Sequence, residues 1–161
     1  MDRITIFLAH AVKLETEAVR CFEDLAEAMA AWGNLETESF FLRMADYARL
    51  HQKDAMDRAG FRELPKLSPE EWQWPEGISP ERPQWVGLDG FTDVAQALDL
   101  ALESEQAAHD FYRQIADTTA DAKVRAMAEE FAEEEAEHVA EVERRIQALA
   151  GNPPGPSGAA G

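Results

Sequence analysis

The chain has 161 residues, the size of one domain with a substantial core. Its 32 acidic and 15 basic residues give a formal net charge of −17, which argues against nucleic acid and anionic membranes as partners and is compatible with attracting cations. The single cysteine, Cys21, excludes an internal disulfide and a four-cysteine iron centre, so any bound metal must be held by oxygen and nitrogen. No segment has the length of a membrane span and none resembles a secretion signal, which predicts a soluble, cytoplasmic protein.

The first half of the chain predicts two helices in a tight hairpin. A helical period of apolar residues runs over residues 2–31 and stops at Gly33, and a second helix is expected from an Asn34 cap to about residue 58, before Gly60. Residues 61–91 then carry five prolines and three tryptophans, which forbids a long helix and allows a short one after Ser68. We expect this segment to cross over the bundle, with its tryptophans in outer packing or a subunit interface.

The second half predicts another pair of helices. One is expected from a cap at Asp93 to about residue 117 and the next from about residue 121 to 149, followed by a disordered tail over residues 151–161. Two hairpins joined by a long connection predict an all-α, ferritin-like four-helix bundle over residues 1–150.

Polar residues interrupt the apolar stripes of these helices at positions that should face the core. The stripe of the fourth helix contains Glu135 and His138, three residues apart. The stripes of the first and third helices each hold one glutamate at the centre, Glu15 and Glu105. Because a buried carboxylate or imidazole needs a partner or a metal, these positions are candidate ligands.

The helices also match one another in pairs. The first and third align at one constant offset that places Glu15 opposite Glu105, and the second and fourth align at another that places His51 opposite His138. The chain is therefore interpreted as a diverged duplication of a helix pair. The duplication is imperfect, because Ala48 stands three residues before His51, where the fourth helix has a glutamate.

Five ligand-type residues are thus expected at similar depth in the bundle. Dinuclear iron or manganese carboxylate sites in such bundles take one Glu from each of two helices and Glu-x-x-His from each of the other two. The i, i+3 spacing places both ligands on one helix face, carboxylates can bridge two divalent ions, and imidazoles favour iron over magnesium. A buried polar network without metal is the alternative. The five residues are Glu15, His51, Glu105, Glu135 and His138.

These segments resemble the rubrerythrin branch of the ferritin-like superfamily, without its rubredoxin module. The resemblance is carried by Leu-Glu-Thr-Glu-Ala over residues 14–18, by Glu-Ser-Glu-Gln-Ala over 103–107 and by Glu-Glu-Glu-Ala-Glu-His over 133–138, and more weakly by residues 44–51. It implies two bound irons, with manganese or zinc as alternatives, and reaction with peroxide or oxygen or oxidation of ferrous iron. It also implies terminal carboxylates at Glu15 and Glu105, a bridge at Glu135, and one imidazole for each metal from His51 and His138.

The departure from the family pattern lies at Ala48, because the matching family residue is a carboxylate that bridges the metals. The centre is therefore expected to be weaker, asymmetric, or limited to one well-held ion, with peroxide or oxygen on the side left open. His109, one turn beyond Glu105, is a candidate substitute ligand or a hydrogen-bonded structural residue. Asp46 and Tyr47 are expected to point away from His51.

Other conspicuous residues have simpler interpretations. Tyr112 is a candidate phenol beside the metals, with a catalytic or orienting role, or a core aromatic. Cys21 should pack as a small hydrophobe. Most acidic residues of the fourth helix are expected to form a solvated face: Glu129, Glu130, Glu133, Glu134, Glu137 and Glu143.

Three functions remain open at this point. The first is an oxidoreductase with a complete or incomplete diiron site, acting on peroxide or oxygen with an unknown electron donor. The second is an iron-binding protein that oxidises or passes on ferrous ions without an organic substrate. The third is a helical interaction module with a decayed metal site. We expect a homodimer.

Overall fold

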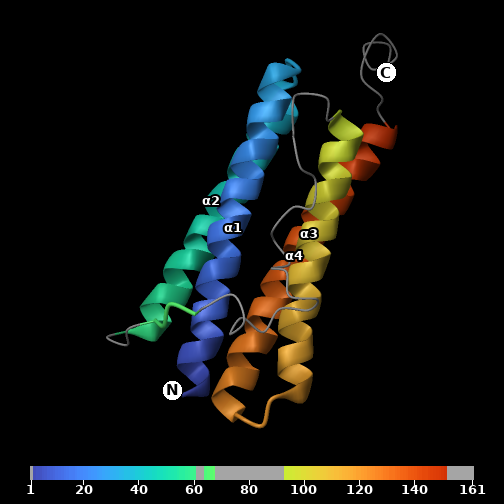
Figure 1. The fold of residues 1–161 in the computed structure, drawn as a ribbon. Coiled ribbons are helices and arrows are strands. Elements are labelled where there is room, and N and C mark those ends of the chain that lie inside the picture. Colours follow the sequence, from blue (N-terminus) through green and yellow to red (C-terminus); the bar gives the residue numbers. More distant parts are fainter. Residues whose placement is uncertain (1, 61–63, 68–92, 152–161) are drawn as a thin grey trace.

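The computed structural model describes residues 2–60, 64–67 and 93–151, and nearly all of them lie in four helices (Figure 1). Their bounds are Arg3–Ala31 for α1, Leu35–Ala59 for α2, Val94–Thr118 for α3 and Ala122–Gly151 for α4. The predicted all-α bundle is confirmed, and each helix ends within a few residues of its expected position. The short helix after Ser68, the tryptophans of the crossover and the tail beyond residue 151 lie outside the described residues.

Local chemistry explains where the helices begin and end. The side chain of Asn34 accepts a hydrogen bond from the Thr37 amide at 3.0 Å and so starts α2, as its position in the sequence predicts. Gly33 has a φ of +74°, a conformation that suits glycine and lets the chain reverse between α1 and α2. At the start of α3, Asp93 and Gln96 form a reciprocal capping box.

The helices are arranged as two antiparallel hairpins side by side. In Figure 1 the turn between α1 and α2 lies at one end of the bundle and the turn between α3 and α4 at the other. Backbone contacts are extensive within each hairpin and sparse between the hairpins. Side chains therefore join them, and ion pairs between α2 and α4 contribute: Arg58 with Glu130, and Arg145 with Glu36 at 2.6 Å.

A polar layer lies between two apolar clusters of the core. One cluster surrounds Phe22, Leu25 and Phe41 towards the α1–α2 turn, and the other surrounds Phe7 and Tyr112 towards the α3–α4 turn. Each large apolar side chain fully buried in these clusters stabilises the fold by about 1.5–3 kcal/mol. This burial offsets the cost of holding a layer of polar groups inside the bundle.

None of the four helices, which together make up most of the described chain, is long and apolar enough to cross a membrane.

Candidate metal centre

Each of the four helices contributes at least one side chain to the polar layer. Glu15 from α1, Glu105 from α3 and Glu135 from α4 are 4%, 1% and 2% exposed, which is rare for carboxylates. His138 from α4 is also buried, whereas His51 from α2 is only partly buried. Of the five residues that the sequence singled out, four are therefore buried, and His51 reaches the layer from its partly exposed edge.

On the side of α3 and α4, the imidazole of His138 faces two carboxylates. Its Nδ1 lies 2.9 Å from Glu105 Oε2 and 3.4 Å from Glu135 Oε2. The Oε2 atom of Glu135 is buried and has no hydrogen-bond partner among the described residues. Burial acts to raise the pKa of Glu135, but the contacts with His138 outweigh burial and place that pKa below its usual value. An anionic oxygen that is buried without a hydrogen bond is suited to receive a cation.

On the side of α1 and α2, His51 lies between two carboxylates. Its Nδ1 is 3.8 Å from Glu15 Oε1 and its Nε2 is 2.9 Å from Glu134 Oε2. Burial opposes the charge on His51, but hydrogen bonds with Glu134 and Glu15 outweigh burial and raise the pKa of His51 to about 10. Burial and the nearby charge of Glu135 raise the pKa of Glu15 well above its usual range.

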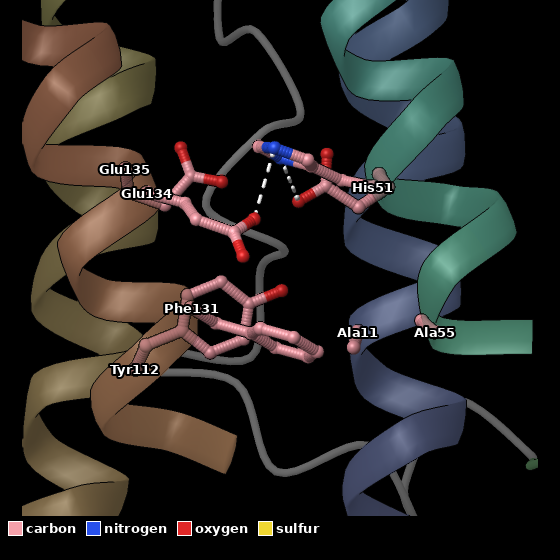
Figure 2. A pocket seen from close by; sticks show the side chains of 8 residues that line it. Ala11, His51, Ala55, Tyr112, Phe131, Glu134 and Glu135 are labelled. Atoms are coloured by element: carbon pink, nitrogen blue, oxygen red, sulfur yellow. Dashed lines mark ion pairs between the residues drawn. The ribbon is translucent and has the colours of Figure 1, made fainter. Parts of the chain in front are cut away.

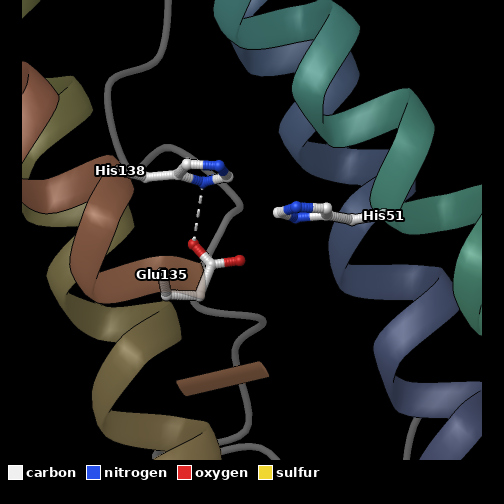
Figure 3. Close-up of side chains that lie close together, drawn as sticks. All are labelled: His51, Glu135 and His138. Carbon is white, nitrogen blue, oxygen red and sulfur yellow. Dashed lines mark ion pairs between the residues drawn. The ribbon is translucent and has the colours of Figure 1, made fainter. Parts of the chain in front are cut away.

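The two sides meet at the centre of the bundle, where the rings of His51 and His138 stack with centroids 4.9 Å apart (Figure 3). His51, Glu135 and His138 each offer one ligand atom, and these atoms lie within 4.8 Å of one another. Donors to a common first-row metal ion lie within about 4.2 Å of each other, because each bond is about 2.1 Å long. Two imidazoles and a carboxylate thus fit an iron, manganese or zinc ion after a small contraction.

A small pocket borders this centre, and Figure 2 shows the side chains that form it. Its polar side consists of Glu15, His51, Glu134 and Glu135. Its apolar wall comes from both hairpins and consists of Ala11, Ala55, Tyr112 and Phe131. Tyr112 is fully buried and packs edge-on against Phe131, with ring centroids 5.4 Å apart. Its place in the wall suits either role predicted for it, and a catalytic role stays a prediction.

The structure does not bring His109 to the centre. Its side chain is one third exposed, and its Nδ1 lies 3.2 Å from Oδ1 of the exposed Asp110. Four residues along a helix rotate a side chain by about 40°, which carries His109 from the inward face of Glu105 towards the surface. His109 is therefore not retained as a ligand in the place of the carboxylate absent at Ala48.

The solvated face of α4 is confirmed with one exception. Glu129, Glu133, Glu137 and Glu143 are exposed, and Glu130 pairs with Arg58 at the surface. The prediction was wrong for Glu134, whose carboxylate contacts His51 across the hairpins.

Asp46 and Tyr47, which precede Ala48 on α2, differ in their surroundings. Asp46 is exposed and pairs with Arg49, as expected of a residue that points away from His51. Tyr47 stacks against the ring of His138 with centroids 5.9 Å apart, a contact that the sequence did not predict. Cys21 is buried in the apolar core, as predicted.

Fold and site together define a four-helix-bundle protein with a buried set of carboxylate and histidine side chains of the kind that binds metal ions. A family model described as the ferritin-like domain matches residues 7–152. The chain belongs to this ferritin-like family.

A solved structure supports the same placement. The crystal structure of an uncharacterised conserved protein from Magnetospirillum magnetotacticum MS-1 superposes with a TM-score of 0.73 at 36% sequence identity. The match covers 88% of this chain and 91% of that one. No curated protein matches the sequence.

Proposed function

We propose that the protein holds iron in the polar layer and acts as an oxidoreductase of the rubrerythrin type on peroxide or oxygen. The observation that carries the proposal is the buried Oε2 of Glu135, which has no hydrogen-bond partner among the described residues and lies in a layer with two other buried carboxylates and two imidazoles. Without a metal ion, the three converging carboxylates depend on contacts with the two imidazoles, and burial together with the charge of Glu135 still raises the pKa of Glu15 well above its usual range.

The ligands divide between the two hairpins. A single ion would lie among His51, Glu135 and His138. With two ions the imidazoles would divide: Glu15 and His51 would hold one ion and Glu105 and His138 the other, with Glu135 between them as the bridge. Because α2 supplies no carboxylate at Ala48, the two ions would share one protein bridge instead of two, and the ion on the side of α1 and α2 would be held less tightly. A bound pair of iron ions supplies reversible one-electron chemistry for the reduction of oxygen or peroxide.

The surrounding residues control access and protons. Phe131 and Ala11 form an apolar wall that limits water at the site. His51 is protonated at neutral pH in the absence of metal, since its pKa is about 10, and it must release a proton when it binds an ion. The buried Tyr112 borders the same pocket and is suited to donate a hydrogen bond or a proton there.

Reconstitution with ferrous iron under anaerobic conditions tests the proposal. We expect between one and two irons per chain by elemental analysis. We also expect peroxide to oxidise the bound ferrous iron faster in the wild type than in a Glu135→Ala variant. Glu137→Ala is the matched control, because Glu137 lies exposed on the same helix. Less than about one metal ion per chain, unchanged by Glu135→Ala, would refute metal binding and favour an interaction module with a decayed site.

The same ligand set also supports an iron-handling protein without an organic substrate. The net charge of −17 favours this second candidate, because an acidic surface raises the local concentration of ferrous ions. Repeated turnover of peroxide with an added electron donor supports the oxidoreductase. A single oxidation of bound ferrous iron, followed by release of ferric iron, supports the iron-handling role.

A further inference from the structure

The contact between Glu134 and His51 crosses from one hairpin to the other at the edge of the candidate centre. Glu134 lies on α4 and reaches the Nε2 atom of His51 on α2 at 2.9 Å (Figure 2). The side chains of Glu134 and His51 are 28% and 21% exposed, so the contact is partly shielded from water. A charge-assisted hydrogen bond of this length is stronger than one between neutral groups.

The two histidines of the centre turn the same ring atom towards the buried carboxylates. His138 directs Nδ1 towards Glu105 and Glu135, and His51 directs Nδ1 towards Glu15. The separation of 3.8 Å between Nδ1 of His51 and Oε1 of Glu15 is close to that of two donors on one ion. The inward nitrogen of His51 is therefore Nδ1, and its Nε2 faces away from the centre towards Glu134.

We propose that Glu134 is a positioning residue for the metal centre, which accepts the Nε2 proton of His51 and thereby presents Nδ1 of that ring to the ion beside Glu15. The inference rests on the proposed iron site. A histidine that binds a metal through one ring nitrogen usually donates the other N–H to a carboxylate or carbonyl group, which fixes the tautomer and the ring orientation. In this chain the carboxylate that orients the His51 ring on α2 comes from α4, in the opposite hairpin.

Neighbouring acidic residues do not have this role, although Asp54 and Glu130 lie close to Glu134. Arg58 pairs with both: its Nε is 3.1 Å from Asp54, and its Nη2 contacts Glu130. Glu134 alone of this group contacts a histidine of the centre among the described residues. The absence of a carboxylate at Ala48 makes the orientation of His51 more important, since α2 then holds the ion through a single side chain.

The first test compares cobalt(II) binding by the full chain with that of Glu134→Ala, Glu134→Gln and the control Glu137→Ala. We expect Glu134→Ala to weaken the ion bound through His51 by roughly 10- to 100-fold. Glu134→Gln keeps an acceptor oxygen and should recover most of the affinity, while Glu137→Ala should match the wild type. Wild-type affinity in Glu134→Ala would overturn the inference.

Measurements in a His51→Ala background distinguish a positioning role of Glu134 from direct binding of Glu134 to the ion. If Glu134 acts through His51, Glu134→Ala should cause no further loss of cobalt affinity in a His51→Ala chain. An equal loss in both backgrounds would show that Glu134 acts on the ion directly or through its charge, and would overturn the positioning role.

A third measurement does not depend on metal and distinguishes failure of this inference from failure of the proposed function. In the protein without metal, nitrogen-15 NMR should show a protected Nε2–H on His51 that is lost in Glu134→Ala and retained in Glu137→Ala. With zinc bound, the same ring should show a protonated Nε2 and a metal-bound Nδ1. A wild-type chain that binds no metal overturns the proposed function together with this inference, whereas zinc bound through Nε2 overturns the inference alone.

Discussion

Restoration of the missing carboxylate by Ala48→Glu is the most informative perturbation of the candidate centre. Ala48 is 2% exposed and packs in the apolar cluster, three residues before His51, so a glutamate there repeats the Glu-x-x-His spacing of α4. Ala48→Gln has nearly the same volume without the charge and is the matched control.

Ala48→Glu should destabilise the metal-free protein and strengthen metal binding in the metal-loaded protein. Without metal, overpacking costs about 1–3 kcal/mol in both variants, and an unpaired buried carboxylate adds about 3–5 kcal/mol in Ala48→Glu. These costs are a large part of a domain stability of about 5–15 kcal/mol. With metal, the carboxylate adds a bridge, and at least a tenfold gain in affinity corresponds to about 1.4 kcal/mol.

Calorimetry with a chelator measures the cost of the substitution in the metal-free protein. Calorimetry at a fixed concentration of free ferrous iron measures the stabilisation that metal binding adds. At about 100 times the dissociation constant, metal stabilises the wild type by about 2.7 kcal/mol, or roughly 5–11 °C in melting temperature. The same free metal should raise the melting temperature of Ala48→Glu by roughly 3–6 °C more than that of the wild type. Ala48→Gln should show no such additional gain.

Anaerobic titration of the same proteins gives the result that would refute this reasoning. The missing-bridge account predicts tighter binding or a higher stoichiometry in Ala48→Glu. A lower affinity in a folded Ala48→Glu protein would mean that alanine at this position makes room for another ligand, so that the added side chain crowds the site.

Other predictions concern the metal and the protons that compete with it. A chelator should lower the melting temperature of the wild-type protein, because Glu15 and Glu135 repel when no cation lies between them; an unchanged melt would favour a decayed site. Between pH 6 and 9 the metal-free protein should lose stability as pH rises. The charged form of His51 stabilises the fold fully below its unfolded pKa of 6.5, and this contribution is lost as pH rises towards its folded pKa of about 10. The raised pKa of Glu15 acts in the same direction. Metal affinity should rise over the same pH range, because metal binding releases protons from the ligands. If the difference in melting temperature between the metal-loaded and metal-free protein does not change with pH, the proposed ligands are wrong. Tyr112→Phe should leave metal stoichiometry unchanged and lower turnover with peroxide at least several-fold if the phenol acts in the reaction, and equal turnover would assign Tyr112 to the core.

The sequence by itself determined the helices and most of the inward ligands. Apolar periodicity, the Asn34 and Asp93 caps and the turn at Gly33 fix elements through interactions within a few residues, which the order of the amino acids specifies directly. The same periodicity placed Glu15 and Glu135 on inward faces, because rotation of about 100° per residue relates them to the apolar stripe of their own helix.

Only the tertiary structure decided which residues at the edges of those stripes meet the centre. Glu134 directly precedes the inward Glu135, and His109 lies one turn beyond the inward Glu105. Glu134 contacts His51, whereas His109 turns to the surface. Tyr47 likewise meets His138 on the opposite hairpin. Helical period sets the direction of a side chain relative to its own helix axis, but whether that direction leads to solvent or to a partner depends on how α2 lies across α4. That arrangement is fixed by packing between segments far apart in the chain, which no local pattern encodes.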